Sequence, residues 1–147
     1  MIKEIQNENF EYINEIYTRK FDFKKQDVEF KMRKEIAQMS FDNYLDEISK
    51  FHSVEVMEAE VKKFVYQLNE NSIILDLGCG WCWHWRDIEK YRPDIKIVAF
   101  DFVYENFLHA KKILSKETKK QIYFVNDDMH NLNFKDNTFD AIWTVQV

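Results

Sequence analysis

Glycine and proline are scarce in this sequence, which has two glycines and one proline among 147 residues. Both glycines, Gly78 and Gly80, lie in one short segment, and Pro93 follows in the same region. Glycine is needed where the backbone turns tightly or approaches a ligand closely, so this segment is the first candidate for a binding site. Cysteine is also rare, and two residues are too few for a disulfide-rich secreted scaffold.

Long apolar runs and clustered basic residues are also lacking. No apolar run reaches the roughly 18 residues that a membrane-spanning helix requires, and the N-terminus has no apolar signal segment. The net charge is -5, and the lysines and arginines are interspersed with acidic residues, a pattern that does not favour nucleic-acid binding. We therefore expect a soluble cytoplasmic protein with no membrane and no nucleic-acid partner. Hydrophobic residues, at 46%, are sufficient for a sizeable core.

Residues 1–70 show apolar side chains at helical spacing. The stripes are Phe10, Ile13, Ile16 and Tyr17; Val28, Met32, Ile36 and Met39; Phe41, Tyr44, Leu45 and Ile48; and Val54, Met57, Val61, Phe64, Val65 and Leu68. We expect this part to form an N-terminal helical cap or lid, and residues 71–147 to form a second unit with a different pattern. Tyr12, Tyr17, Arg19 and Arg33 are conceivable contacts of such a lid, although each is more typical of an ordinary helix surface.

After residue 71, short apolar segments alternate with helical ones. Strands are predicted over 72–77, 95–100, 121–125 and 139–145, and helices over 83–91 and 105–114. Strands that alternate with helices form a parallel sheet, because each helix returns the chain to the end of the sheet at which the preceding strand began. The helices then cover the faces of this sheet. The expected fold class is therefore α/β.

Polar residues follow three of these strands at the ends where ligands bind in parallel sheets. The first strand ends at Asp76-Leu77-Gly78-Cys79-Gly80, the second at Asp101, and the third precedes Asp128-Met129. Asp101 lies 21 residues beyond Gly80, close to the spacing at which a carboxylate accepts hydrogen bonds from ribose hydroxyls. At Asp128-Met129, the aspartate can accept a hydrogen bond from an exocyclic amine while the apolar neighbour packs against the ring that carries the amine. Residues 126–128 are equally consistent with a plain polar turn. Together the three segments favour a ligand with a nucleoside.

These segments resemble the motifs of class I S-adenosylmethionine-dependent methyltransferases. The resemblance rests on Ile74-Leu75-Asp76-Leu77-Gly78-Cys79-Gly80, on Phe100-Asp101-Phe102, on residues 128–134 and on Asp136-Asn137-Thr138-Phe139-Asp140, in the family's order and spacing. It implies a Rossmann-like parallel sheet of about four strands in the order 3-2-1-4, flanked by helices, and S-adenosylmethionine as the cofactor. It also implies methyl transfer by in-line displacement to a small-molecule acceptor. The resemblance implies that Gly78 and Gly80 approach the methionine part, Asp101 the ribose, Asp128 and Met129 the adenine, and Val145 with Gln146 the amino-acid end. Asp76, Cys79 and Phe102 belong to the same implied set of cofactor-binding residues.

Two features depart from the family pattern. Cys82 stands where a third glycine is usual, and its side chain would narrow the approach to the cofactor. The family's sheet also has more strands than the four predicted here, so the sequence resembles a fold truncated after its fourth strand. An uncovered fourth strand would present an apolar sheet edge, which predicts pairing with a second copy of the chain.

Other functions remain open at this point. Cys79 and Cys82 form a CxxC pair that would suit a redox dithiol, and His84 beside them would suit a metal, but a zinc site needs further Cys or His ligands that the sequence does not supply. No metal is therefore expected. A methyltransferase-like binding or scaffold protein that needs a partner chain is a second alternative. His84 and His130 are weak candidates for a general base, because imidazole titrates near neutrality.

Overall fold

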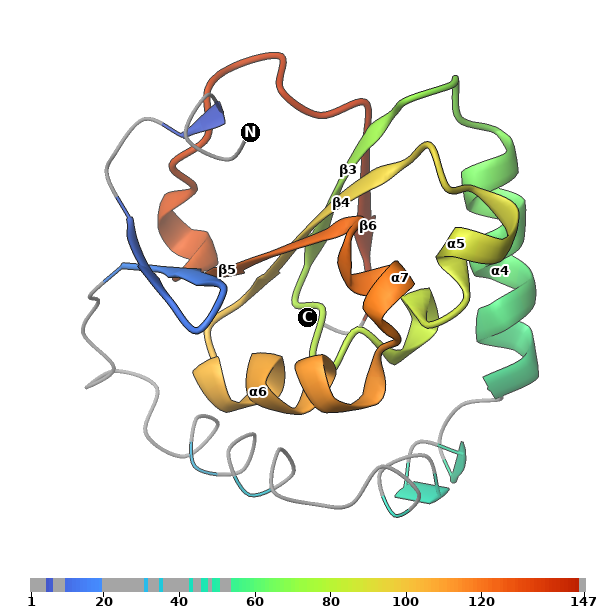
Figure 1. Cartoon of the computed structure of the whole chain (residues 1–147), viewed down its shortest axis with the longest axis horizontal. Helices are drawn as coiled ribbons and strands as arrows, with labels where there is room; N and C mark the ends of the chain where they lie inside the picture. Colours follow the sequence, from blue (N-terminus) through green and yellow to red (C-terminus); the bar gives the residue numbers. More distant parts are fainter. Residues whose placement is uncertain are drawn as a thin grey trace.

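A six-stranded sheet lies at the centre of the computed structural model, which describes residues 5–6, 10–19, 31, 35, 43, 46–47, 49–50 and 54–145 (Figure 1). The four predicted strands are present as β3 (Ile73–Leu77), β4 (Lys96–Asp101), β5 (Ile122–Asn126) and β6 (Ala141–Thr144). They pair in parallel as β5-β4-β3-β6, which confirms the order 3-2-1-4. The α/β, Rossmann-like class is thereby confirmed for this part of the chain.

A β-hairpin occupies the segment in which the first helix was predicted. Its strands, β1 (Glu11–Ile13) and β2 (Ile16–Thr18), are joined by Asn14 and Glu15, which have φ values of 52° and 63°. Two successive residues with positive φ fit the tight turn that matches the twist of paired strands. The helix prediction for residues 10–17 is therefore wrong, because Ile13 and Ile16 are spaced as on one helix face but in fact pair across the turn. The stripes predicted over 28–39 and 41–48 lie outside the described residues, apart from a few isolated positions.

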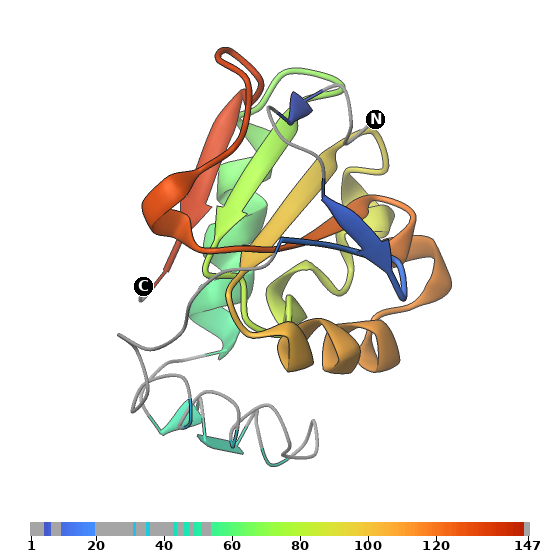
Figure 2. The ribbon, with the colours of Figure 1, turned by 90° about the vertical axis from the view of Figure 1, so that its left-hand side faces the viewer.

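The hairpin enlarges the sheet from four strands to six and makes it mixed. β2 runs parallel to β5, and β1 pairs with β2 in the antiparallel sense, so the full order is β1-β2-β5-β4-β3-β6. Figure 2 shows the hairpin and β6 at opposite ends of this sheet. The hairpin therefore lies next to β5, and the end of β2 lies beside the carboxyl end of β5.

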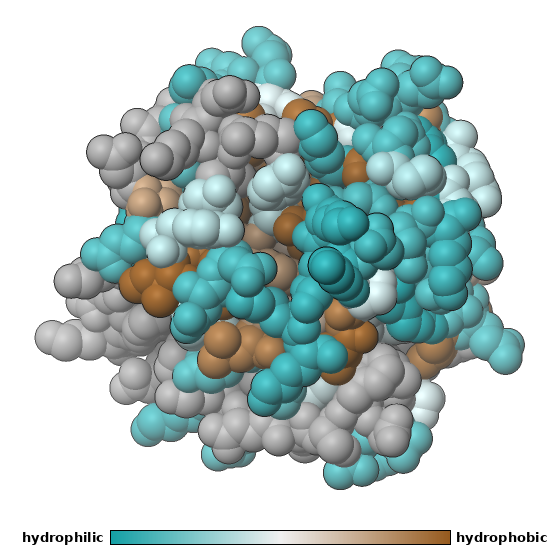
Figure 3. Space-filling model, in the orientation of Figure 1, coloured by the Kyte–Doolittle hydropathy of each residue, from teal (hydrophilic) through white to brown (hydrophobic). Residues whose placement is uncertain are grey.

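Helices cover one face of the sheet. α4 (Val54–Tyr66), α5 (Ile88–Tyr91) and α6 (Tyr104–Ile113) contribute buried side chains to a core that includes alternate residues of β3, β4 and β5. This core contains Val61, Val65, Ile74, Ile88, Ile97, Ala99, Phe107, Ala110 and Phe124. α7 (Lys116–Lys119) lies beside α5, where the Thr118 hydroxyl donates to the Glu89 carboxylate over 2.5 Å. In the space-filling view, the hydrophobic groups of the visible described surface are scattered among hydrophilic ones (Figure 3), which is ordinary for a protein surface.

The helix predicted over 83–91 is interrupted. Its first part is a single 3-10 turn, η1 (Trp83–Trp85), and its second part is α5, with Arg86 and Asp87 between them. At the interruption, the side chains of His84 and Trp85 both contact the buried carboxylate of Asp76 in β3.

The second face of the sheet is covered differently. Its buried residues are Leu75, Val98, Phe100 and Val125. Within the described residues, the side chains packed over them come from the chain around Ile5 and Phe10 and from the segment between Met129 and Phe139. β6 is the edge strand here, and Ile142 on it is 57% exposed. The sequence predicts helices on both faces of the sheet. In the described residues, helices cover one face.

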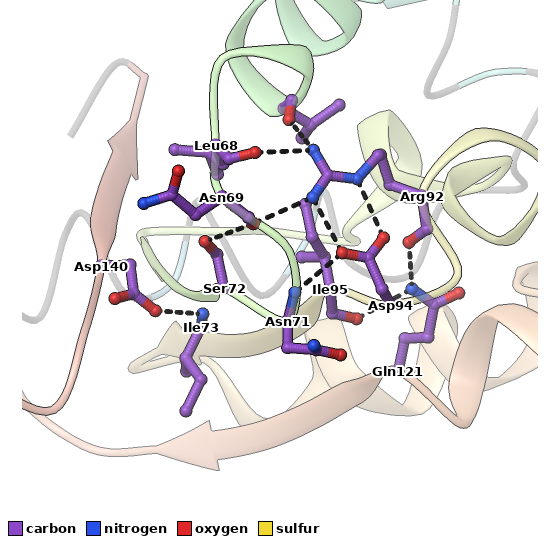
Figure 4. A network of polar contacts seen from close by, with 11 residues as sticks. Leu68, Asn69, Asn71, Ser72, Ile73, Arg92, Asp94, Ile95, Gln121 and Asp140 are labelled. Carbon is purple, nitrogen blue, oxygen red and sulfur yellow. Dashed lines mark hydrogen bonds and ion pairs between the residues drawn. The ribbon is translucent and has the colours of Figure 1, made fainter.

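An arginine clamp closes the amino edge of the sheet (Figure 4). The Arg92 guanidinium donates to the carbonyls of Val65, Leu68 and Asn69 at the end of α4 and also binds the Asp94 carboxylate. The last carbonyls of a helix lack partners within the helix, so this arginine satisfies them. The Arg92 guanidinium also holds the pKa of the Asp94 carboxyl well below its usual range. An open hollow of about 530 Å³ adjoins the clamp, at the opposite edge from the predicted cofactor residues.

Candidate functional site

The turn after β3 keeps the backbone conformation that glycine favours. Gly78 and Gly80 have φ values of 72° and 55°, and Cys82 also adopts a positive φ of 58°. The amides of Gly78 and Cys79 donate to the Phe100 carbonyl at 2.8 and 3.2 Å, which fixes the turn against the end of β4. Cys82 therefore adopts the left-handed backbone conformation that glycine favours. Its side chain is fully buried in the core on the helical face, so it does not line the turn's outer surface.

Asp101 joins this turn to the end of β4. Its carboxylate accepts from the Gly80 amide at 2.9 Å and from the Val103 amide at 2.8 Å, and the Asn106 amide group donates to it at 3.3 Å. The residue is 5% exposed. The glycine turn after β3 and the acidic end of β4, which the sequence singled out, are thus joined by the Asp101 carboxylate. The sequence predicts a ribose contact for Asp101, and the structure adds that the same carboxylate holds the glycine turn.

Asn106 and Trp81 extend this contact, and Asn106 was missed in the sequence. The Trp81 indole donates to the Asn106 side-chain oxygen at 3.1 Å, and its ring stacks on His109 with 4.5 Å between ring centroids. Asn106 is buried inside α6, where asparagine is a poor helix former. A polar residue of this kind among apolar helix positions is the sequence signal that could have identified it.

Asp76 is surrounded by aromatic side chains. It is 1% exposed, and its Oδ2 accepts from the Trp85 indole at 2.6 Å and lies 2.8 Å from Nε2 of His84. A buried carboxylate requires such donors, because an unpaired buried charge is costly. His84, predicted as a weak candidate base, is therefore bound to Asp76 through one ring nitrogen, and its side chain is 9% exposed.

Asp128 and Met129 lie at the carboxyl end of β5, within the short turn η2 (Met129–Asn131) and its N-cap. Oδ1 of Asp128 accepts from the backbone amide of His130 at 3.0 Å and lies 2.6 Å from its Nδ1. These bonds hold the pKa of the Asp128 carboxyl below its usual range. Met129 is half-buried and packs on the second face of the sheet. His130, the other candidate base, is 75% exposed beside Asp128.

The remaining predicted residues occupy the same edge of the sheet. Phe102 is half-buried directly after Asp101, and Val145, 37% exposed, follows β6. Gln146 lies outside the described residues. The carboxyl edge therefore brings together residues that follow β3, β4, β5 and β6, as expected for parallel strands.

The redox and metal interpretations receive no support from this geometry. Cys79 and Cys82 are both free and buried, and burial raises the pKa of each thiol. A raised pKa lowers the thiolate fraction that dithiol chemistry requires. Among the residues that the structure describes, no three His, Cys, Asp or Glu side chains are grouped as a metal site. Within the same residues, no helix has the length and apolarity to cross a membrane.

Comparisons with known proteins agree with the fold and the motifs. The family described as "Methyltransferase domain" matches residues 74–147, which is half of the chain. No curated protein matches the chain in sequence.

Three solved structures of similar fold share less than a quarter of their residues with this chain. The first is an inferred S-adenosyl-L-methionine-dependent methyltransferase from Methanococcus maripaludis, with a TM-score of 0.57 and 23% identity over 86% of this chain and 52% of that one. The second is a chain from the complex of the Haloferax volcanii Trm112 methyltransferase activator with an inferred methyltransferase, with a TM-score of 0.56 and 18% identity over 76% of this chain and 46% of that one. The third is a SAM-dependent methyltransferase from Aquifex aeolicus, with a TM-score of 0.52 and 22% identity over 67% of this chain and 55% of that one. The chain spans about half the length of these relatives.

Proposed function

Because the chain belongs to the family of methyltransferase domains, we propose that it binds S-adenosylmethionine at the carboxyl edge of its sheet and donates the methyl group to a small-molecule acceptor. The observation that carries this proposal is the Asp101 carboxylate, which bonds the Gly80 amide of the glycine turn at 2.9 Å. Two motifs that are far apart in the sequence are thereby held at one place, where a ligand can touch both.

We propose one group at this edge for each part of the cofactor. Gly78 and Gly80 have no side chains, so the backbone of the turn can approach the methionine portion, and Val145 is the neighbour proposed at its amino-acid end. Asp101 and Phe102 are proposed to flank the ribose. Asp128 accepts both of its described hydrogen bonds on Oδ1, which leaves Oδ2 as the acceptor proposed for the adenine amino group, with Met129 packed against the ring.

The chemistry required of the protein is mainly positioning. When bound, S-adenosylmethionine supplies an activated methyl group on a sulfonium, with a neutral thioether as the leaving group. Hydrogen bonds within the chain itself hold the turn against β4: the Gly78 and Cys79 amides donate to the Phe100 carbonyl, and the Gly80 amide donates to the Asp101 carboxylate. Such preorganisation reduces the entropy cost of aligning donor and acceptor.

Calorimetric titration of the folded chain tests the proposal. We expect one site per chain for S-adenosylmethionine and for its demethylated product S-adenosylhomocysteine, because both carry the adenosine and amino-acid portions that these residues would contact. NAD is the control ligand, since it distinguishes this site from a dinucleotide-binding Rossmann fold. Absence of heat with both sulfur ligands, or preferential binding of NAD, would show that the proposal is wrong.

A second proposal concerns the exposed edge of the sheet, which suits a partner chain. Ile142 on β6 is 57% exposed, and among the described residues β6 pairs with β3 alone. Unpaired apolar edges favour association, so we propose a homo-oligomer that forms through β6. One structural relative comes from a complex of a methyltransferase with an activator protein, which makes a different partner chain the alternative.

Replacing Ile142 with lysine is expected to shift the chain toward the monomer in light scattering, because a charge on an edge strand opposes strand pairing. The matched control is Val56→Lys, which changes a residue of similar exposure (60%) on α4. A wild-type chain that is monomeric at all concentrations would contradict the oligomer, as would an unchanged mass in Ile142→Lys.

A further inference from the structure

Arg19, directly after the hairpin, is bound to the turn that carries Asp128. Its Nε and Nη2 donate to the two carboxylate oxygens of Asp127, each at 2.9 Å, and Nη2 also donates to the Asn131 carbonyl at 3.2 Å. In the amide orientation that suits its neighbours, the side-chain oxygen of Asn133 accepts from Nη1 at 2.6 Å. One guanidinium therefore touches the segment before, inside and after η2.

The Arg19–Asp127 pair is not an ordinary surface ion pair. The Asp127 side chain is fully buried and that of Arg19 is 19% exposed. Burial raises the pKa of the Asp127 carboxyl, and the Arg19 guanidinium opposes that rise. A fork of two parallel hydrogen bonds fixes direction as well as charge, and lysine cannot reproduce it.

Asp127 links the Arg19 guanidinium to the backbone of Asp128. Its Oδ1, which accepts from Arg19, also accepts from the Asp128 amide at 2.8 Å. The Asp127 amide in turn donates to the Asp101 carbonyl at 3.2 Å. The backbone of Asp128 is thus held between Arg19 and the end of β4. The direction of the Asp128 carboxylate depends on that backbone.

We propose that Arg19 is a positioning residue that aims Asp128 at the 6-amino group of the bound adenine, and so contributes to selection of the adenine ring. The inference depends on the proposed function, because it assumes that adenine lies beside Asp128. It assigns to the hairpin a part in ligand recognition, although the hairpin itself need not touch the ligand.

The test compares two ligands that differ at one position of the ring. S-Adenosylhomocysteine has an amino group at position 6, and S-inosylhomocysteine has an oxygen there, which would face the Asp128 carboxylate. We expect the wild-type chain to prefer the first by roughly 10- to 100-fold, the effect of one hydrogen bond to a charged group. In Arg19→Lys, which keeps the charge and loses the fork, affinity for S-adenosylhomocysteine should fall about tenfold while affinity for S-inosylhomocysteine changes little.

Arg92→Lys is the matched control, because Arg92 also binds a carboxylate and backbone carbonyls but lies at the opposite edge of the sheet. It should leave the ratio of the two affinities unchanged. The inference is overturned if Arg19→Lys changes both affinities by one common factor or neither, or if the wild-type chain binds the two ligands equally. A wild-type chain that binds neither ligand would instead overturn the proposed function, and this inference with it.

Discussion

Replacing Asp101 with alanine is expected to weaken binding of S-adenosylhomocysteine by at least about 100-fold and to lower the free energy of unfolding by about 2–4 kcal/mol. The carboxylate accepts the amides of Gly80 and Val103, and the residue is 5% exposed. Without it these amides lose their acceptor in a site with little access to water, and the glycine turn is no longer tied to β4. Calorimetry measures the first effect and urea denaturation the second.

Asp140→Ala is the control for this substitution. Asp140 also uses its carboxylate to accept a backbone amide of the sheet, that of Ile73 at 2.8 Å, but it is exposed and lies at the amino end of β3. Its loss should lower the free energy of unfolding by about 1 kcal/mol and leave affinity unchanged. Full retention of affinity in folded Asp101→Ala would contradict a role for this carboxylate in the binding site.

The parallel strands were predictable because they carry two independent signals. β3, β4 and β5 are short runs of β-branched and aromatic residues, and each ends at polar residues or glycine. Their order followed from the resemblance of the motifs. The acidic residues after them were predictable for the same reason, because parallel strands bring their carboxyl ends to one edge.

The hairpin and the aromatic cluster were harder to predict for different physical reasons. Residues 10–17 are too few to distinguish a helical period from a hairpin, and the decisive pairing of β2 with β5 joins residues more than 100 positions apart. The contact of Arg19 with Asp127 depends on that pairing, so it could not be found before the hairpin was known. The sequence also does not show that the indole of Trp85 donates to the Asp76 carboxylate.

Truncation of Trp85 to alanine is expected to lower the free energy of unfolding by about 3–5 kcal/mol, the usual cost of removing a large buried aromatic side chain. Trp85 is fully buried, and its ring meets Trp143 of β6 with 5.8 Å between centroids. The change therefore opens a cavity between η1 and the sheet and removes a donor from Asp76. Urea denaturation followed by circular dichroism measures the loss, with an unchanged m-value as the sign that the unfolding transition is the same.

Two conservative variants separate the packing from the hydrogen bond. Trp85→Phe keeps most of the buried ring but removes the indole donor that lies 2.6 Å from Oδ2 of Asp76. Trp83→Phe makes the same chemical change at a residue that is 5% exposed and whose indole has no hydrogen bond within the described residues. We expect Trp85→Phe to cost about 1–3 kcal/mol more than Trp83→Phe, because a buried carboxylate that loses a donor bears the desolvation cost. Equal costs would mean that packing alone accounts for Trp85, and that His84 by itself satisfies Asp76.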